Sequence, residues 1–306
     1  MILVTGASGL LGLSFALTAQ ARDIPVGAAS LSLRISIPDV PTISEDVRSP
    51  AFLSKMRELR PSSVVHCAAM TDVDGCQEHP EDAQLVNALA TGAIARTASE
   101  SGASFVYVST DSVFDGARGG YAEADTPHPI NVYAATKLQG EAAALKECPG
   151  SLVIRTNIFG WRARERPTLA EWIVRTLRAG ETVPGFTDTF FNPILTTHVS
   201  EVILDLIAQG EQGVMHVAGR DRRSKFEFAR EMAATFDLPT ERVVESSLAD
   251  SSLRAPRPLD TCLDVSQVES ILDRRMPTLA EGLSDFRHQE FDGFVDTIKA
   301  SLGDLS

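Results

Sequence analysis

Tyr133 and Lys137 are the two residues whose types and spacing point most directly to chemistry. They are four positions apart, so a helix would place them one turn apart on the same face. A free tyrosine titrates near pH ~10 and is a poor acid at neutral pH. A neighbouring ammonium group stabilises the phenolate and lowers the pKa of the phenol, which could then give a proton to a carbonyl oxygen. The pair therefore indicates general acid chemistry at a carbonyl group.

Hydroxyl side chains and a glycine-rich loop complete this chemistry. Ser109 and Thr110 lie upstream of the pair, and their hydroxyls could hold the same carbonyl oxygen. The segment Gly6-Ala7-Ser8-Gly9-Leu10-Leu11-Gly12 follows an apolar run and opens a helical pattern. Glycines there allow a pyrophosphate to approach the amides and the positive end of the helix. The sequence thus predicts hydride transfer between a dinucleotide and a carbonyl carbon.

The identity of the dinucleotide is less sharply indicated. An acidic residue at the end of the second strand would hold the ribose 2′-hydroxyl of NAD, but residues 27–34 contain none. Arg34 could instead meet a 2′-phosphate, or it could be a solvated surface residue. We expect NADP, with NAD as the alternative. Asp46 and Val47 are candidates for the adenine end, although Asp46 could equally serve an adjacent helix N-terminus.

Alternating short apolar runs and helical patterns predict a parallel sheet with crossover helices in the N-terminal half. The expected strands are 1–4, 24–29, 63–67, 104–109 and 151–155, and the expected helices are 10–21, 50–59, 80–101 and 133–146. Beyond residue 160 we expect helices over 167–178, 197–209 and 224–236 and a strand over 214–217. The fold class is α/β: a Rossmann-type doubly wound parallel sheet with a smaller mixed α/β C-terminal substrate lobe.

The domain boundaries expected from this pattern are discontinuous. Residues 1–160 form the NAD(P)-binding domain, and 197–220 return to it. Residues 161–196 and 221–306 form the substrate lobe, in which the charged stretch 220–235 is interpreted as a solvated helix.

Composition excludes several classes of partner. The chain has 306 residues and a net charge of −13, which disfavours nucleic acid and anionic membrane surfaces. No signal peptide and no apolar run of spanning length is visible, so we expect a cytoplasmic protein. The four cysteines and six histidines show no metal-ligand spacing, and no metal site is expected. A homodimer is left open.

With these motifs placed, the chain resembles the extended short-chain dehydrogenase/reductase superfamily, and within it the dTDP-4-dehydrorhamnose reductases. The resemblance is dense from residue 1 to about 160 and thinner beyond. The residues that carry it are Thr5-Gly6-x-x-Gly9-x-x-Gly12, His66-Cys67-Ala68-Ala69, Val86-Asn87-Ala88, Ser109-Thr110-Asp111-Ser112-Val113-Phe114-Asp115-Gly116, Tyr133-x-x-x-Lys137-x-x-Gly140-Glu141 and Arg257-Pro258.

The resemblance implies roles for particular residues. Thr110, Tyr133 and Lys137 would be the catalytic group. The pyrophosphate would be cradled by Gly6, Ser8, Gly9, Leu10 and Leu11. The rest of the cofactor would be lined by Asp46, Val47, Ala68, Ala69 and Ser109, with Tyr133 and Lys137 on the nicotinamide ribose.

Substrate candidates come from the same comparison and from residue chemistry. Asp111, Ser112 and Asn157 would lie beside the sugar, and Trp161 could face it or simply pack. Asn192 could hydrogen-bond a nucleobase or hold a turn. Arg257 is a candidate for the substrate diphosphate, because a guanidinium matches phosphate geometry.

Three functions stay open at this point. Sugar 4,6-dehydratases of the superfamily carry Thr-Asp-Glu where this chain has Thr110-Asp111-Ser112, and the missing glutamate argues against dehydration. We therefore expect an NAD(P)H-dependent reductase of a nucleotide-activated 4-keto-6-deoxy sugar. The alternatives are a nucleotide-sugar epimerase and a non-catalytic NADP-binding regulatory subunit like that of methionine adenosyltransferase.

Overall fold

A seven-stranded parallel sheet forms the centre of the protein, in a computed structural model that describes residues 1–31, 35–162, 164 and 166–303. Strand β1 lies between β4 and β2, with Thr5 in register with His66 of β4 on one side and with Ala29 of β2 on the other. The strand order is β11 (Gly213–His216), β6 (Leu152–Arg155), β5 (Ser104–Val108), β4 (Ser63–His66), β1 (Ile2–Thr5), β2 (Val26–Ser30) and β3 (Thr42–Ser44).

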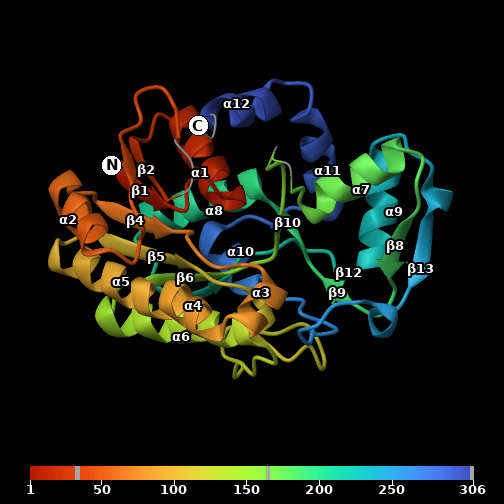
Figure 1. Ribbon diagram of the computed structural model, residues 1–306, viewed down its shortest axis with the longest axis horizontal. Coiled ribbons are helices and arrows are strands. Elements are labelled where there is room, and N and C mark those ends of the chain that lie inside the picture. The colour runs from red at the N-terminus through yellow and green to blue at the C-terminus, as the bar shows by residue number, and fades with distance from the viewer. Residues whose placement is uncertain (32–34, 163, 165, 304–306) are drawn as a thin grey trace.

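Helices cover both faces of this sheet (Figure 1). α1 (Leu10–Ala21) packs on α8 (Thr196–Gln209), and α5 (Ala90–Glu100) packs on α2 (Pro50–Leu59) and on α6 (Val132–Glu147). The face that carries α5 and α6 also holds α3 (Val73–Glu78), α4 (Pro80–Gln84) and a π-helical turn η1 (Leu85–Leu89). Helices on both faces of a parallel sheet define the doubly wound α/β class, so the predicted fold class is confirmed.

A second group of elements packs beside the carboxyl ends of the strands, on the right in Figure 1. α7 (Leu169–Arg178) and α9 (Lys225–Thr235) contact each other and strand β8. The short strands pair as β7 (Ile158–Phe159) with β10 (Ile194–Leu195), β9 (Phe190–Phe191) with β12 (Arg223–Ser224), and β8 (Val183–Phe186) with β13 (Val243–Ser246). The remaining elements are the 3-10 turns η2 (Asp111–Val113), η3 (Thr240–Arg242) and η4 (Leu248–Asp250) and the helices α10 (Ser266–Leu272), α11 (Leu279–His288) and α12 (Phe294–Ser301).

Helix boundaries follow local capping chemistry. Ser49 caps α2, in which Pro50 occupies the first turn, and Ser224 and Glu227 form the capping box that the sequence predicts for α9. The sequence analysis predicts one helix over 80–101, but a π-helical turn separates α4 from α5 there. The sequence analysis does not predict α3, which precedes this region. Strand β11 lies beside β6 in the main sheet. The exact domain boundaries stay a prediction.

Candidate active site

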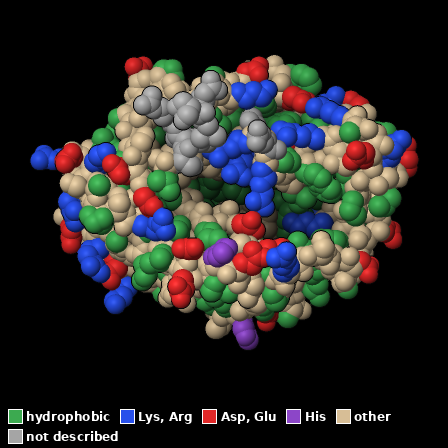
Figure 2. Space-filling view, viewed as in Figure 1, with side chains coloured by type: hydrophobic (Ala, Val, Ile, Leu, Met, Phe, Trp, Pro, Cys, Tyr) green, Lys and Arg blue, Asp and Glu red, His purple; other side chains and the backbone are tan. Residues whose placement is uncertain are grey.

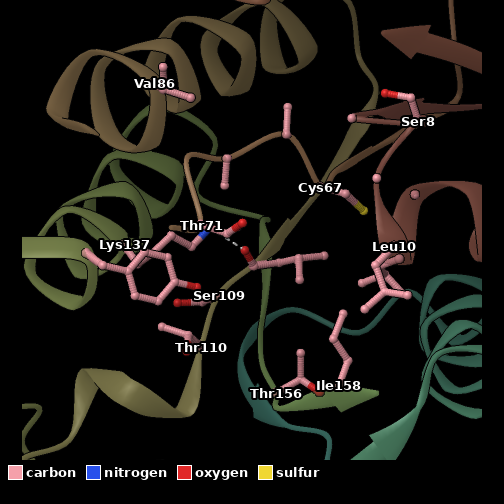
Figure 3. Close-up of a pocket in the computed structure, with 18 of the residues that line it drawn as sticks. Ser8, Leu10, Cys67, Thr71, Val86, Ser109, Thr110, Lys137, Thr156 and Ile158 are labelled. Carbon is pink, nitrogen blue, oxygen red and sulfur yellow. Dashed lines mark hydrogen bonds between the residues drawn. The ribbon is translucent and has the colours of Figure 1, made fainter. Parts of the chain in front are cut away.

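A cavity of about 630 Å³ opens at the carboxyl ends of β1, β4 and β5. This edge is where open parallel sheets bind ligands, because the connections on the two sides diverge there. In Figure 3, Ser109, Thr110 and Lys137 lie on one side of the cavity and Ser8 and Leu10 on the other. All the sequence-predicted cofactor residues that the structure describes line it, namely Gly6, Ser8, Gly9, Leu10, Leu11, Asp46, Val47, Ala68, Ala69, Ser109, Tyr133 and Lys137.

The glycine loop is built for close approach of a phosphate. Gly6 has a φ of 63°, and a Cβ on it would lie 2.7 Å from the backbone of Ala68. A Cβ on Gly12 would lie 2.4 Å from the carbonyl oxygen of Gly6. The N-cap residue of α1 is Gly9, which offers no side-chain cap, so the first amides of the helix face the cavity without a side-chain partner. These residues therefore fit the pyrophosphate of a dinucleotide.

The other end of the cavity carries an ion pair. Arg48 donates to both carboxylate oxygens of Asp46, with Nη2 2.6 Å from Oδ2, and these hydrogen bonds lower the pKa of Asp46. Both residues line the cavity with Ser30, whose hydroxyl donates to Ser8 Oγ at 2.8 Å. Arg48 was not among the sequence candidates, although its position two residues after Asp46 allows the pairing. Arg34, the predicted 2′-phosphate contact, lies outside the described residues.

Helix α6 fixes the tyrosine–lysine pair. Asn131 caps the helix by accepting from the amide of Ala134 at 2.8 Å, and its own amide donates to the carbonyl of Pro256. This cap sets Tyr133 in the first turn and Lys137 one turn later on the same face. Lys137 Nζ donates to the carbonyl of Val108 at 2.6 Å, the bond dashed in Figure 3, and lies 4.1 Å from the ring centroid of Tyr107. The amine is thereby held at the end of β5.

Burial controls the protonation of both groups. It raises the pKa of Tyr133 to about 12, while hydrogen bonding with Thr110 acts in the opposite direction. It lowers the pKa of Lys137 to about 7, against the raising effect of the Glu141 carboxylate. The sequence-based expectation that Lys137 lowers the pKa of the phenol misses the dominant effect, which is desolvation. The phenol therefore holds its proton at neutral pH, and it needs a positive charge beside it to give that proton up.

Asp111 is the centre of a polar cluster beside Thr110. Its carboxylate is almost fully buried and accepts from Thr110 Oγ1 at 3.1 Å and from Asn157 Nδ2 at 2.7 Å. Ser112 Oγ and Thr261 Oγ1 donate to the same carboxylate. Asp111, Ser112 and Asn157 all line the cavity. Thr261 brings the C-terminal region to this cluster, a contact that no motif in the sequence indicated.

Trp161 and Asn192, which were predicted to contact the substrate, form their contacts away from the cavity. Trp161 is buried, stacks on Phe286 with 4.2 Å between ring centroids, and donates from Nε1 to the carbonyl of Phe286. Asn192 is buried and bonds three backbone groups, the carbonyls of Gly219 and Leu263 and the amide of Leu263. Neither lines the cavity. The first prediction is corrected to core packing and the second to turn structure, because both polar groups are already satisfied.

Arg257 also lies away from the cavity. Its guanidinium forms an ion pair with Asp74 at 3.0 Å and donates to the carbonyl of Ala255. Asp74 belongs to α3, so Arg257 ties the segment near residue 255 to the N-terminal region. The predicted diphosphate contact has no support in this geometry.

Several basic residues near the cavity escaped the sequence analysis. Arg162 and Arg164 line it, and Arg164 Nη2 donates to the carbonyl of Ser8. Lys225, in the stretch interpreted as a solvated helix, has its Nζ 3.0 Å from the ring centroid of Phe191. Burial lowers the pKa of Lys225 to about 8, while Asp111 and Cys262 raise it. Arg162 and Arg164 line the cavity, whereas Lys225 does not line it but interacts electrostatically with Asp111, which does. Only tertiary structure creates these contacts, so no local motif could have revealed them.

Within the described ranges, no group of three or more His, Cys, Asp or Glu side chains could hold a metal ion. No helix in that part of the chain is both long enough and apolar enough to cross a bilayer.

A glycine loop opposite a tyrosine–lysine pair, on a doubly wound sheet, defines the class as an extended short-chain dehydrogenase/reductase. Residues 1–290 match the RmlD substrate binding domain family, and the chain belongs to that family.

Relatives with different activities resemble the chain over most of its length. The probable low-salt glycan biosynthesis reductase Agl14 of Haloferax volcanii is 34% identical, over 92% of this chain and 95% of that protein. Methionine adenosyltransferase 2 subunit beta of Danio rerio is 29% identical, over 88% and 84%. Among solved structures, the dTDP-4-dehydrorhamnose reductase of Bacillus anthracis in complex with NADP superposes with a TM-score of 0.84 at 25% identity, over 94% and 98% of the two chains. The family and fold are those of nucleotide-sugar reductases.

Proposed function

We propose that the chain is an NADPH-dependent reductase of a nucleotide-activated 4-keto-6-deoxy sugar. The observation that carries the proposal is the convergence of Thr110, Tyr133 and Lys137 on one cavity with the uncapped N-terminus of α1. The nearby relatives that are reductases, one of them solved with NADP, support both the activity and the cofactor. NAD is the alternative cofactor.

The reaction divides among the residues of the cavity. When bound, the dinucleotide supplies hydride to the keto carbon. Thr110 holds the carbonyl oxygen when its hydroxyl turns from Asp111 to the substrate, and Tyr133 gives that oxygen a proton from a phenol that burial keeps protonated. Lys137, held at Val108, stabilises the phenolate that is left behind. Asp111 and Asn157 orient the sugar from the neighbouring polar cluster.

A substrate panel tests this function. The full chain is incubated with NADPH and the dTDP-, GDP-, UDP- and CDP-activated 4-keto sugars, and the loss of NADPH absorbance is followed. Net consumption with any of them supports a reductase. Sugar inversion without net consumption would make the protein an epimerase. Binding of NADPH without any reaction would favour a regulatory subunit, the role suggested by the resemblance to methionine adenosyltransferase 2 subunit beta.

The rate of reduction is expected to fall as pH rises through the pKa of Lys137, about 7. Below that pKa the ammonium is charged and stabilises the phenolate. Above it the amine is neutral, and kcat/KM should decline up to about tenfold per pH unit. The apparent pKa belongs to Tyr133 and Lys137 together, because the two groups interact. It is read from a profile of kcat/KM between about pH 6 and 9. Lys137→Arg, which stays protonated, should lose this alkaline decline. A wild-type profile that is flat across the range would contradict the role of Lys137.

Lys225 is the residue that we propose for the negative charge of the substrate. Its amine lies over Phe191 within reach of the charge on Asp111, and no ion pair is formed by it among the described residues. Lys225→Met should raise KM for the nucleotide sugar roughly 10-fold or more, the value of a lost charge-assisted contact, with a smaller effect on kcat.

Two variants serve as comparisons for Lys225. Arg222 lies 3.5 Å from the ring centroid of Phe190 but is paired with Asp260, so Arg222→Met should leave KM close to the wild-type value. Arg257→Ala tests the earlier assignment of the diphosphate contact. If Arg257→Ala raises KM and Lys225→Met does not, the substrate charge is bound at Arg257.

A further inference from the structure

The segment between β7 and α7 carries three arginines, Arg162, Arg164 and Arg166, which we call the arginine segment. It is fixed at both ends. The amide of Arg162 donates to Glu171 Oε1 at 3.2 Å, and Thr168 Oγ1 donates to the carbonyl of Gly160 at 3.0 Å. Thr168 and Glu171 also form the capping box of α7. Arg162 and Thr168 are therefore anchored to α7, a helix that packs outside the main sheet.

Two of the three side chains point into the cavity. Arg162 and Arg164 line it together with the glycine loop, and Arg164 reaches the carbonyl of Ser8. Arg166 is exposed and pairs loosely with Asp72, at 3.3 Å. Figure 2 shows basic side chains gathered beside the hollow on this face of the molecule.

Within the described part of the chain, the side chains of Arg162 and Arg164 each have a hydrogen-bond donor that is not satisfied. The Nε atoms of Arg162 and Arg164 are buried and have no hydrogen-bond partner among the described residues. Burial and the positive charge of Arg162 both lower the pKa of Arg164. Like charges repel strongly where water is scarce, and a buried unpaired donor is costly. The arrangement is thus complete only with an anion beside it.

The carboxylates that line the cavity do not supply that anion. Asp46 is bound by Arg48, and Asp111 accepts from Thr110, Ser112, Asn157 and Thr261. Within the part of the chain that the structure describes, neither bonds to Arg162 or Arg164. An anionic ligand in the cavity could satisfy the two Nε donors.

We propose that Arg162 and Arg164 bind the pyrophosphate of the dinucleotide, together with the first amides of α1. The location selects this phosphate, because Arg164 meets Ser8 inside the loop from Gly6 to Gly12, where those amides are directed. The adenosine 2′-position is expected farther along, past the end of β2. The inference rests on the proposed function only in taking a dinucleotide as the ligand.

Dissociation constants test the proposal without any turnover. Arg162→Gln and Arg164→Gln in the full chain should each weaken NADPH and NADH by a similar factor, roughly 10-fold or more. ADP, which carries the diphosphate, should weaken in parallel. Adenosine 2′-monophosphate, which carries no phosphate on its 5′ oxygen, should bind almost as before. Arg164→Lys should recover part of the loss, and its melting temperature shows whether the fold is intact.

Arg166→Gln is the matched control, since it removes the same charge from the same segment outside the cavity. An equal loss of dinucleotide affinity in Arg166→Gln would mean that the arginines act through long-range charge and not through contact, which would overturn the proposal. A loss confined to NADPH and adenosine 2′-monophosphate would assign the arginines to the 2′-phosphate and would overturn the proposal. Unchanged dinucleotide affinities would remove the arginines from the site and would also overturn it. The proposed function fails separately, if the wild-type chain binds NADPH with the expected dependence on the arginines but reduces none of the nucleotide sugars.

Discussion

Replacing Tyr133 by phenylalanine is expected to lower kcat by about 10²–10⁴-fold, the usual contribution of a positioned general acid. The ring keeps its place at the start of α6, because the cap at Asn131 and the packing of the helix do not involve the hydroxyl. Only the proton donor is lost. The measurement is steady-state reduction of the best substrate from the nucleotide panel, followed by NADPH consumption.

The dissociation constant of NADPH separates catalysis from binding in this variant. Tyr133 is one of many residues that line the cavity, and the glycine loop and the first turn of α1 are the proposed site of the pyrophosphate, so Kd should change by only a few fold. Thr110→Val is a useful companion, since it removes the hydroxyl that bonds with Tyr133 while keeping the shape. If Tyr133→Phe retains near-wild-type turnover, the acid is another group and the proposed chemistry is wrong.

The catalytic pair could be predicted from the sequence because its geometry is local. A spacing of four residues becomes one face of a helix whatever the rest of the chain does, and α6 carries Tyr133 and Lys137 accordingly. The glycine loop was predictable for the same reason, since Gly6 to Gly12 lie between a strand and the helix that directly follows it. Short-range rules determine both features.

The substrate side was less predictable because it depends on contacts distant in sequence. Arg257 has the right chemistry for a phosphate, yet Asp74, more than a hundred positions away, holds its guanidinium. Trp161 likewise stacks on Phe286, which is also distant in sequence. Conversely, Lys225 and Arg164 look like surface residues in the sequence. In the folded chain, Lys225 lies over the ring of Phe191 and Arg164 donates to the carbonyl of Ser8.

The pKa of Tyr133 shows a further limit of pattern reading. The motif indicates an ammonium beside a phenol, and an isolated pair of this kind would acidify the phenol. The motif does not reveal how deeply both groups are buried. In the folded protein desolvation opposes the charged form of each group and moves the two pKa values apart, to about 12 and about 7.

A buried ion pair behind the active site sets the largest expected effect on stability. Glu141 and Arg155 are almost fully buried, and Arg155 Nη2 lies 2.7 Å from Glu141 Oε2. Arg155 Nε also donates to Glu141 Oε1 at 3.0 Å, so the contact is bidentate, and Ser109 Oγ donates to the same oxygen. Glu141→Gln would leave the arginine charge uncompensated in the core, and Arg155→Met would do the same to the carboxylate.

Each single change should reduce the free energy of unfolding by about 3–5 kcal/mol, the usual cost of an unpaired buried charge. The double variant Glu141→Gln/Arg155→Met should recover most of that loss, because the apolar chain replaces a charge and the amide oxygen can still accept from Ser109. Urea denaturation of the four proteins measures the coupling. Single variants that lose less than about 1 kcal/mol would show that the pair is well solvated, against its burial.

The Glu141→Gln/Arg155→Met variant should also shift the pH dependence of kcat/KM, because it removes the negative charge of Glu141. Glu141 raises the pKa of Lys137 against the effect of burial, so removing its carboxylate lowers that pKa further. The alkaline decline of kcat/KM should then begin at a lower pH in the double variant than in the wild type, even though the double variant is folded. An unchanged pH profile together with restored stability would confine the ion pair to a structural role. A shifted profile would show that Glu141 acts on the proton donor through Lys137, one turn away along α6.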